Sequence, residues 1–368
     1  MPHLSPAREK ILNGCRITAD EAMALLDHAD LPELGFLAHS VRQRLHPEPM
    51  VTFVIDRNIN YTNGCVSGCR FCAFYRPPDH PDAYVISEAD LTRKIEETLA
   101  LGGTQILLQG GMNPNLDLAY YEELLRFIKS RFAIHIHGFS PPEIVFMANQ
   151  AGISVPDVLK RLISAGLDSI PGGGAEILAD DIRTRISPGK CLADAWLNVM
   201  ETAHRLKLRT TATMMFGHIE SQEHILAHLM KIRDLQDRTG GFTAFIPWTF
   251  QPDHTKLSVV KATAVQYLRV LAVSRLVLDN VPNIQASWVT QGDKIAQVAL
   301  AFGANDLGST MIEENVVAAA GVSFRLSVAD MIRMITGAGY RAVQRDCYYN
   351  PLRTHGVPDE AAGKTAEG

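Results

Sequence analysis

Three cysteines stand close together in the sequence, at Cys65, Cys69 and Cys72, with the spacing C-x3-C-x2-C. Gly64 and Gly68 allow the backbone between them to fold tightly around an inorganic core. Three thiolates can hold three irons of a 4Fe–4S cluster and leave the fourth iron without a protein ligand. Such an open iron is a binding site for a chelating molecule, for example the amino-acid part of S-adenosylmethionine (SAM). We therefore expect these three cysteines to be iron ligands.

Other interpretations of the cysteines involve no open iron. Structural zinc prefers four ligands, usually in two pairs, and no second Cys/His pair is evident, although His80, Cys191 or Cys347 could supply the fourth ligand. A chance cluster of buried thiols is a further alternative. An iron–sulfur electron carrier normally coordinates every iron, so three cysteines favour an enzyme over a carrier or a zinc-stabilised binding protein.

Two glycine-rich segments each follow a short apolar run. Gly110 and Gly111 come directly after Gln109, and three glycines at 172–174 precede Glu176. Consecutive glycines cost conformational entropy, and close approach of the backbone to a ligand is a natural reason to keep them. A plain turn between a strand and a helix is the alternative. No Lys-Ser/Thr follows 172–174 to complete a phosphate-binding loop.

Two histidines alternate with isoleucines in the next run, where Ile134 and Ile136 precede His135 and His137. Side chains two residues apart lie on one face of a strand, so both histidines can meet a substrate if that face lines a pocket. A metal site and ordinary polar residues at a strand end are the alternatives. We favour His137 as a substrate contact and assign no metal to the pair. Ser140, in the following loop, either donates a hydrogen bond or caps a helix.

Further polar and basic residues lie near these motifs. Four of these residues stand shortly before the cysteines in the sequence, and three follow the second glycine run: Arg57, Asn58, Asn60 and Asn63, then Arg183, Arg185 and Lys190. They suit polar or anionic groups of a substrate, above all a carboxylate. Turns and a solvated helix face are the alternatives. The segment 214–216 (Met-Met-Phe) fits a core better than a cofactor site.

Short apolar runs and longer amphipathic stretches alternate along the chain. The expected strands are 51–55 or 59–61, 105–109, 134–138, 167–170, 210–216, 243–249, 284–289 and 306–307. The expected helices between them are 88–101, 118–130, 155–165, 193–206, 222–238, 263–278 and 292–301. Such alternation predicts parallel βαβ units in an α/β fold. Eight units would close a (βα)8-type barrel with its active site at the carboxyl ends of the strands, and an open doubly wound sheet is the alternative.

Four segments divide the chain on this interpretation. Residues 1–50 have helical spacing and form an N-terminal helical extension. Residues 51–310 form the barrel core, and residues 311–356 are expected to complete it with helices. Residues 357–368 are small and polar, so we expect a disordered tail.

The composition is that of a globular protein. Of 368 residues, 46% are hydrophobic and 20% are charged, enough apolar material for a sizeable core. The net charge of −5, without a basic block, argues against nucleic acid or an anionic membrane as a partner. No run approaches the roughly 20 apolar residues of a membrane helix, and the first residues lack the apolar stretch of a secretory signal. Six cysteines are too few for a disulfide framework, so we expect a cytoplasmic protein.

The cysteine motif, with Phe71 just before its last cysteine, resembles the signature of radical SAM enzymes. Further segments resemble, more closely, the dehypoxanthine futalosine cyclase family (the cyclic dehypoxanthinylfutalosine synthases) of the futalosine route to menaquinone. These segments are DRNINYTNGCVSGCRFCAFYR (56–76), TQILLQGGMNPNLDLAYYEELLR (104–126), HIHGFSPPEI (135–144), SIPGGGAEIL (169–178) and TATMMFGHIES (211–221). Aminofutalosine synthases and deazaflavin-synthesis enzymes share parts of this pattern.

The resemblance implies two cofactors, a 4Fe–4S cluster on the three cysteines and SAM at its open iron. The residues it implies as cofactor contacts are Phe71, Gln109, Gly110, Gly111, Gly173 and Glu176. In relatives the residue after the glycine pair is acidic, whereas Met112 stands here, a departure that is compatible with backbone carbonyl contacts but argues against a carboxylate contact from this motif. Glu176 has the position from which relatives contact the amino group or ribose of SAM.

The implied reaction is the cyclisation of dehypoxanthine futalosine. An external reductant of the flavodoxin or ferredoxin type reduces the cluster, and SAM cleavage yields a 5′-deoxyadenosyl radical that removes the ribose C4′ hydrogen. The substrate radical adds to the benzoate ring, and loss of an electron and a proton gives cyclic dehypoxanthine futalosinate. His137 and Glu176 are the candidates for removing the ring proton. An aminofutalosine synthase, which joins an enolpyruvoyl benzoate to the adenosyl radical, and a deazaflavin-synthesis enzyme are the alternatives.

Overall fold

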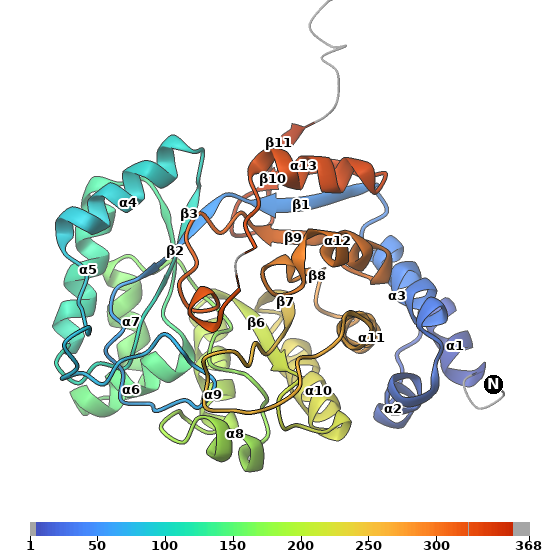
Figure 1. Ribbon diagram of the computed structural model, residues 1–368, viewed down its shortest axis with the longest axis horizontal. Helices are drawn as coiled ribbons and strands as arrows, with labels where there is room; N and C mark the ends of the chain where they lie inside the picture. Colours follow the sequence, from blue (N-terminus) through green and yellow to red (C-terminus); the bar gives the residue numbers. More distant parts are fainter. Residues whose placement is uncertain (1–4, 323, 356–368) are drawn as a thin grey trace, which may run out of the picture.

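A ring of parallel strands lies at the centre of the computed structural model, which describes residues 5–322 and 324–355 (Figure 1). One sheet follows chain order and is parallel throughout: β2 (Asp56–Asn60), β3 (Gln105–Gln109), β4 (His135–Gly138), β5 (Ser169–Ile170), β6 (Arg209–Phe216), β7 (Phe242–Thr249) and β8 (Asn283–Ile284). Parallel order of this kind requires a crossover between each pair of strands, which the helices supply.

A bent strand closes the ring. β1 (Met50–Val54) runs into β2 with only Ile55 between them, and it pairs in parallel with β9 (Asp306–Ser309). A single bridge from Gln285, just after β8, to Asp306 joins the other end of the sheet to β9. Counting β1 and β2 as one strand, the described residues contribute eight strand positions. The expected (βα)8-type barrel is therefore confirmed.

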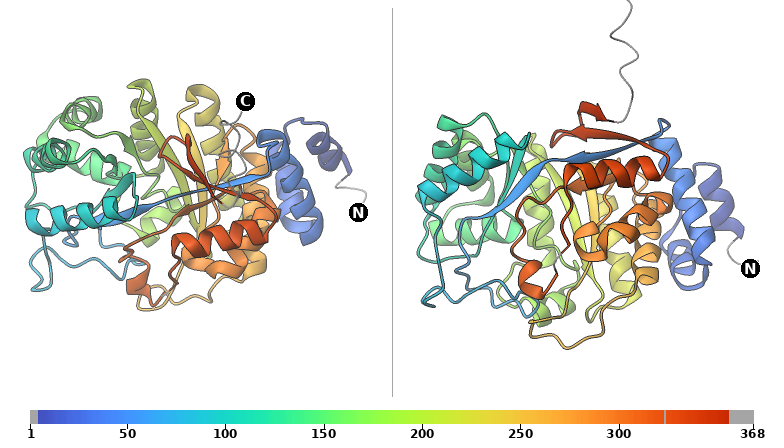
Figure 2. Two further views of the ribbon diagram at one scale, coloured as in Figure 1. Left: turned by 90° about the horizontal axis from the view of Figure 1, so that it is seen from above. Right: turned by 45° about the horizontal axis from the view of Figure 1, so that its top comes forward.

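Helices cover the outside of the barrel (Figures 1 and 2). They are α4 (Glu88–Ala100), α5 (Leu118–Arg131), α6 (Pro141–Ala151), α7 (Val155–Ala165), α8 (Asp180–Ile186), α9 (Ala193–Arg205), α10 (Gln222–Thr239), α11 (Ala264–Val277) and α12 (Trp288–Ala299). α7 shows why they form: Ser154 caps its first turn, Gly166 ends it with a left-handed backbone, and Val158 and Leu162 recur at helical spacing on its buried face.

Three N-terminal helices pack against one side of the barrel (Figure 2). They are α1 (Ser5–Leu12), α2 (Ala19–His28) and α3 (Leu31–Leu45). α3 packs on α11, and α2 contacts both α10 and α11. Leu34, Leu37 and Ala38 are completely buried, so α3 extends the hydrophobic core beyond the ring of helices.

The C-terminal part carries strands as well as a helix. It contains the short helices η2 (Leu300–Phe302) and η3 (Ala318–Ala320), then α13 (Val328–Gly337), β10 (Arg341–Arg345) and β11 (Pro351–His355). β10 pairs with the edge of β1 opposite β9, and β11 pairs antiparallel with β10. The expectation of helices alone over 311–356 is corrected here, because β1 offers a free edge whose backbone groups β10 satisfies. Residue 356 and the expected tail 357–368 lie outside the described residues.

Residues 345–350, the floor segment, cross the amino ends of the barrel strands. Arg345 pairs with both carboxylate oxygens of Asp306 at the start of β9, at 2.6 and 2.9 Å. The Tyr348 hydroxyl donates to the backbone oxygen of Asp168, just before β5. The floor segment therefore closes the end of the barrel opposite the loops that carry the cysteines and glycines.

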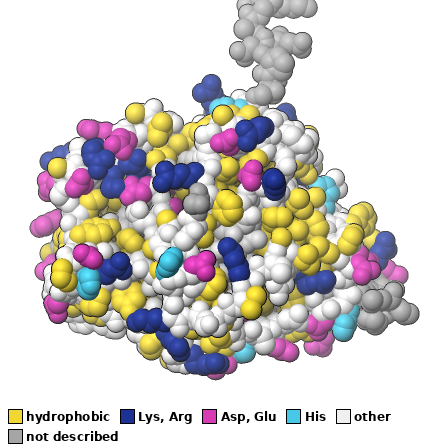
Figure 3. Space-filling model, in the orientation of Figure 1, with side chains coloured by type: hydrophobic (Ala, Val, Ile, Leu, Met, Phe, Trp, Pro, Cys, Tyr) yellow, Lys and Arg dark blue, Asp and Glu magenta, His cyan; other side chains and the backbone are white. Residues whose placement is uncertain are grey.

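The charges on the surface and the lengths of the helices complete the description of the fold. Acidic and basic side chains are interspersed over the face seen in Figure 3. Within the described residues, no helix combines the length and the apolar character needed to cross a membrane.

Candidate active site

The cysteine loop lies at the carboxyl end of β2. The Ser67 hydroxyl stands between two of its sulfurs, 3.0 Å from Cys65 Sγ and 3.2 Å from Cys69 Sγ. The backbone N–H of Met112 donates to Cys65 Sγ at 3.3 Å. Burial raises the pKa of Cys69 to about 11 and also raises the pKa of Cys72, on which the charge of Cys65 acts as well. The three cysteines thus lie close together in one loop, and their role as iron ligands stays a prediction.

The donor set of this loop fits a multi-iron cluster better than a single ion. In the part of the chain that the structure describes, only His135, His137 and Cys347 bring three metal-donor atoms within 4.8 Å of one another. The loop sulfurs are spread more widely than one zinc ion needs, and each iron of a cluster takes its own sulfur. Two of the three proposed fourth zinc ligands are unsuited to this role: Cys347 belongs to the floor segment and His80 is exposed. Cys191 lies near Glu176 and Arg183, on the side of Lys190.

Gly111 brings the end of β3 onto the cysteine loop. A Cβ at this position would lie 2.1 Å from the backbone oxygen of Gly64 and 2.7 Å from Cys65 Cβ. The Gly111 N–H also donates to the backbone oxygen of Thr62. Only glycine permits this approach, so the glycine pair is positioned beside the cysteines, as expected of a cofactor-binding segment.

A carboxylate from another element supports the glycine pair. Met112 is buried and supplies no charge. Glu143 of α6 accepts hydrogen bonds from the Gly110 N–H at 3.1 Å and from the Tyr61 hydroxyl at 2.6 Å, and burial raises its pKa. Ser140 forms a capping box with Glu143, which identifies Ser140 as the cap of α6 rather than a free donor.

The second glycine loop is held by Arg183. Its buried guanidinium donates to the backbone oxygens of Gly174 and Cys191, and of Ala175 at 2.5 Å. A Cβ on Gly173 would lie 2.5 Å from Gln109 Nε2, so this loop approaches the end of β3. The structure thus brings the two glycine segments to opposite sides of one space.

Glu176 has an unsatisfied carboxylate oxygen in this space. Its Oε1 accepts from Lys190 Nζ at 2.9 Å, whereas its buried Oε2 has no hydrogen-bond partner and lies 3.7 Å from Arg183. Its backbone is left-handed, with φ +41°, which a non-glycine residue adopts only under tertiary constraint. Buried polar atoms normally have partners, so Oε2 marks a place for a ligand.

Lys190 links Glu176 to the cysteine loop. Its Nζ lies 5.0 Å from the centre of the Phe71 ring. Burial lowers the pKa of Lys190, but the neighbouring Cys69 and Glu176 raise it by more, so the amine stays protonated. Phe71, Glu176 and Lys190 thus lie beside the cysteine loop. The carboxylate of Glu176 and the ammonium group of Lys190 suit the two charges of the amino-acid part of SAM.

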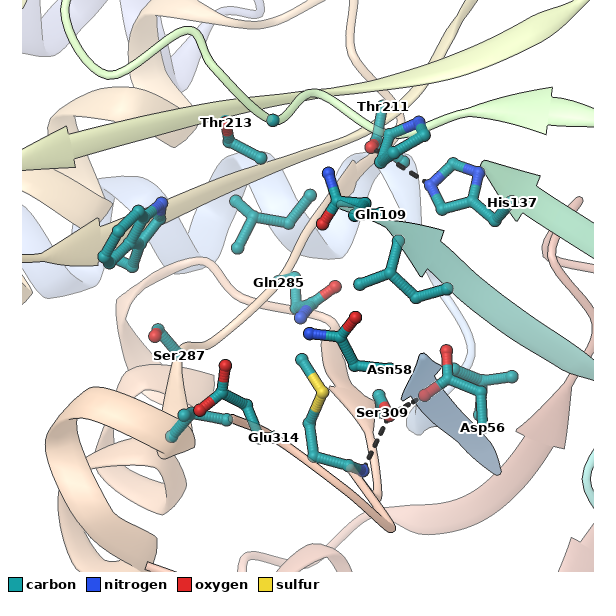
Figure 4. Close-up of a pocket in the computed structure, with 18 of the residues that line it drawn as sticks. Asp56, Asn58, Gln109, His137, Thr211, Thr213, Gln285, Ser287, Ser309 and Glu314 are labelled. Atoms are coloured by element: carbon teal, nitrogen blue, oxygen red, sulfur yellow. Dashed lines mark hydrogen bonds between the residues drawn. The ribbon is translucent and has the colours of Figure 1, made fainter. Parts of the chain in front are cut away.

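A cavity of about 290 Å³ extends from these loops toward the floor segment. Polar side chains converge on it from several strands: Asp56, Asn58, Gln109, His137, Thr211, Thr213, Gln285, Ser287, Ser309 and Glu314 (Figure 4). Ile246 and Trp248 of β7 supply apolar lining. The buried Asn58 Oδ1 has no partner. The cavity thus offers hydrogen bonds and an aromatic surface to a ligand that carries both.

Asp56 is a pocket residue that the sequence analysis missed. It accepts hydrogen bonds from Gln105 at 2.7 Å and from the Ser309 hydroxyl, and burial raises its pKa. Alternating polar residues in β2, at Asp56 and Asn58, were the available signal, because residues two apart share a face. The same alternation exists at Thr211 and Thr213.

The two histidines of β4 share one face, as expected. His137 Nδ1 lies 2.6 Å and His135 Nε2 lies 2.7 Å from the hydroxyl of Ser169 on β5. Burial lowers the pKa of His137 to about 3, with His135 and Arg345 adding to the effect, so its imidazole is neutral near pH 7. Only His137 lines the cavity.

Several expected substrate contacts point elsewhere. Arg57 alternates with the cavity residues of β2 and pairs with Glu97 at 2.8 Å on the outside of the barrel. Arg185 is exposed. Asn63 binds the backbone of the 82–84 segment. Strand alternation and local turn bonds therefore remove these side chains from the cavity.

Family models match most of the chain. Residues 59–232 match the radical SAM superfamily, and residues 239–356 match the CofH/MqnC C-terminal region. The hydrogenase maturase HydG from Carboxydothermus hydrogenoformans has the same fold, with a TM-score of 0.74 at 15% identity over 95% of this chain and 81% of that chain. Methylornithine synthase (PylB) gives a TM-score of 0.70 at 18% identity, over 90% and 96%.

Curated relatives are much more similar in sequence. The chain is 46% identical to a cyclic dehypoxanthine futalosine synthase from Halalkalibacterium halodurans over 94% of both proteins, and 43% identical to one from Streptomyces coelicolor over 96% of this chain and 90% of that protein. It is 42% identical to a 5-amino-6-(D-ribitylamino)uracil–L-tyrosine 4-hydroxyphenyl transferase from Methanopyrus kandleri over 86% and 88%.

The barrel and its three-cysteine loop define a radical SAM enzyme, which uses a 4Fe–4S cluster together with SAM. Within that superfamily, the chain belongs to the family that shares the CofH/MqnC C-terminal region and includes the cyclic dehypoxanthine futalosine synthases.

Proposed function

We propose that this protein converts dehypoxanthine futalosine into cyclic dehypoxanthine futalosinate on the futalosine route to menaquinone. The observation that carries the proposal is its identity of 46% and 43% to two cyclic dehypoxanthine futalosine synthases over at least 90% of each chain. The cavity supports it, since polar side chains suit the hydroxyls of a ribose and Trp248 offers a surface to an aromatic ring.

The cofactor residues take the following roles in this proposal. Cys65, Cys69 and Cys72 hold the cluster. When bound there, the cluster and SAM would supply the radical chemistry that removes the C4′ hydrogen of the substrate ribose. The free oxygen of Glu176 accepts from the SAM amino group, and the backbone of the glycine pair approaches the same group. The other proposed cofactor contacts are Phe71, Gln109 and Gly173.

The chain's own work on the substrate is positioning, exclusion of water and removal of one proton. Asn58 and the threonines of β6 orient the sugar, and the floor segment closes the far end of the cavity. His137 removes the proton that the benzoate ring loses after cyclisation. We prefer it to Glu176 because His137 is connected through the Ser169 hydroxyl to His135, whereas Glu176 is paired with Lys190 and is assigned to the SAM amino group.

The cellular setting is part of the same proposal. We place the protein in the cytoplasm and assign its electron to a flavodoxin- or ferredoxin-type carrier. Neither nucleic acid nor a membrane is a partner.

A hydroxyphenyl transferase of deazaflavin synthesis is the second candidate. The specific observation in its favour is the 42% identity to the Methanopyrus kandleri transferase, close to the value for the cyclases. An aminodeoxyfutalosine synthase from Thermus thermophilus follows at 39% over 96% of both chains.

Anaerobic turnover with C4′-deuterated dehypoxanthine futalosine tests the proposal. We expect deuterium in the released 5′-deoxyadenosine, formed in about equal amount to the cyclised product. Mass spectrometry of both products is the measurement. Unlabelled 5′-deoxyadenosine beside genuine product contradicts C4′ abstraction. Conversion of an enolpyruvoyl benzoate or of tyrosine plus the ribitylaminouracil, without cyclisation, assigns the protein to one of the other two activities.

A further inference from the structure

We propose that His137, Ser169 and His135 form a proton relay that carries the substrate's proton out of the cavity through the amino end of the barrel. The inference rests on the proposed function for the origin of that proton, a ring C–H of the cyclised radical. His137 is the catalytic residue of this relay, since it faces the cavity, and Ser169 and His135 act through it.

The geometry forms a continuous chain of hydrogen bonds. β4 and β5 pair with His137 directly opposite Ser169. The Ser169 hydroxyl lies 2.6 Å from His137 Nδ1 and 2.7 Å from His135 Nε2. Cys347 Sγ, at 3.4 Å, is the remaining polar neighbour of that hydroxyl. One hydroxyl therefore connects both imidazoles at distances short enough for proton transfer.

Hydrogen-bond donors and acceptors give the relay a direction. The relay requires the His137 proton on Nδ1, where it is donated to Ser169, which in turn donates to His135 Nε2. The Thr211 hydroxyl accepts from the Gly172 N–H at 3.0 Å and lies 3.5 Å from His137 Nε2, so it can donate to Nε2 in this tautomer. That long contact is given up when Nε2 takes the substrate proton, and Ser169 and His135 form the path behind it.

The charge is better tolerated at the outer histidine. Burial, His135 and Arg345 all oppose an imidazolium at His137. His135 is only partly buried; burial, with Lys129, lowers its pKa as well, but the carboxylates of Asp168 and Asp346 offset part of that effect. Its ring lies edge-on to the exposed Tyr348, with 5.0 Å between ring centres. A proton that enters at His137 therefore leaves most easily at His135.

The transfers balance in atoms and charge. The ring proton binds His137 Nε2, the Nδ1 proton moves to Ser169, the Ser169 proton moves to His135 Nε2, and His135 Nδ1 releases a proton to water. No electron passes along the relay. The electron lost by the substrate radical goes to a one-electron acceptor, the oxidised cluster or the external carrier.

A metal ion on the same residues is the competing explanation. His135, His137 and Cys347 offer donor atoms within 4.8 Å of one another. The Ser169 hydroxyl, however, lies among them and bonds both imidazoles, so a bound ion would have to displace it. Metal analysis of the holoenzyme therefore belongs to the test.

The main experiment compares product partition in Ser169→Ala, Ser169→Thr and His135→Gln holoenzymes. If the relay operates, Ser169→Ala and His135→Gln lower the ratio of cyclised product to 5′-deoxyadenosine at least tenfold, because hydrogen abstraction precedes proton loss. The solvent deuterium isotope effect on product formation should rise in both. Ser169→Thr keeps the hydroxyl and should recover the ratio. Ser274→Ala, which removes a buried hydroxyl bonded only to the Val270 backbone oxygen of α11, is the matched control and should match wild type.

A spectroscopic experiment tests the relay independently of the identity of the substrate. Nitrogen-15 NMR of histidine-labelled holoenzyme should show His137 as the Nδ1–H tautomer, and Ser169→Ala should change that signal without lowering iron content. An unchanged product ratio in Ser169→Ala, or an Nε2–H tautomer in wild type, overturns the relay. The relay is also overturned if the wild-type protein binds zinc in stoichiometric amount and His137→Gln removes that zinc. A wild-type holoenzyme that does not cyclise dehypoxanthine futalosine refutes the proposed function, and the NMR arm then decides the relay.

Discussion

Single residues in this site are held in conformations that local preference disfavours. Glu176 has φ +41°, a region that costs a non-glycine residue about 1 kcal/mol or more. The surrounding structure maintains it: Arg183 binds the flanking backbone oxygens and Lys190 binds one carboxylate oxygen. The other oxygen is left buried without a partner. A strained backbone, a buried side chain and a carboxylate oxygen without a hydrogen-bond partner are together typical of a ligand-binding carboxylate.

Glu176→Gln should therefore weaken SAM binding. The change keeps the size of the side chain and removes its charge, so a charge-assisted bond to the SAM amino group is replaced by a neutral one. We expect an increase in the dissociation constant of about tenfold, equivalent to roughly 1.4 kcal/mol. Equilibrium dialysis with reconstituted protein measures it.

The control for that variant is Glu122→Gln. Glu122 is also buried and ion-paired, with Arg161 and Arg126, but it lies on α5 and does not line the cavity. It should lower the melting temperature and leave SAM affinity unchanged. Equal affinity of Glu176→Gln and wild type would remove Glu176 from the cofactor site.

At the scale of elements, the site forms where loops from different strands touch. Gly111, after β3, lies against Gly64 in the loop after β2, and there a Cβ would meet backbone. Gly173, after β5, approaches Gln109 of β3, and there the close contact of a Cβ, at 2.5 Å, would be with the end of a flexible side chain, with Ser140 Cβ at 3.4 Å. The two glycines therefore have different roles. Gly111 determines how two loops pack, whereas the absence of a side chain at Gly173 leaves room for the side chain of Gln109.

Gly111→Ala should displace the cysteine loop, because the 2.1 Å approach to the Gly64 oxygen cannot be relieved by a rotamer change. We expect iron content after reconstitution to fall at least fivefold, with a smaller loss in Gly173→Ala. Iron and sulfide assays provide the measurement. Gly337→Ala, near the end of α13 with only Gln297 Nε2 at 3.2 Å, is the matched control. Full iron content in Gly111→Ala would refute this packing role.

At the scale of the whole molecule, two histidines buried in the interior are neutral near pH 7. Burial lowers the pKa of His228, which lies on α10 and accepts from the Leu178 N–H, to about 3, and the pKa of His204 to about 4. A group whose folded pKa lies below its unfolded value, about 6.5, stabilises the fold above pH 6.5. That stability is lost as the pH falls from about 6.5 toward the folded pKa, so acid should destabilise the barrel through these residues.

His228→Gln isolates one such contribution. The variant lacks the buried imidazole, so its free energy of unfolding should differ most from wild type above pH 7. The difference should shrink by up to about 1.4 kcal/mol per pH unit between pH 6 and pH 4. Urea unfolding at several pH values measures it, and exposed His80→Gln should show no such trend. A difference that stays constant from pH 7.5 to pH 4.5 would contradict the assignment.

The sequence by itself determined the elements whose local signals agree. The 105–109 strand and the 155–165 helix have the predicted bounds, because strand alternation and helix caps are local properties. The expected 284–289 strand ends at Ile284, since α12 starts at Trp288. α6 was not among the expected helices, and only the possible role of Ser140 as a helix cap pointed to it. The cysteine spacing was also sufficient to predict that the three cysteines lie together in one loop; their role as cluster ligands stays a prediction.

Only the tertiary structure decided which separated residues meet. Glu143 comes from α6 to the glycine pair, and Ser169 joins two histidines across strands. Cys347 returns to the barrel from 178 positions beyond Ser169. Such contacts depend on strand register and chain closure, for which no local pattern of residues carries a signal. The same cause moved Arg57 out of the cavity: whether a polar residue of β2 faces inward follows from the register of β2 against β3.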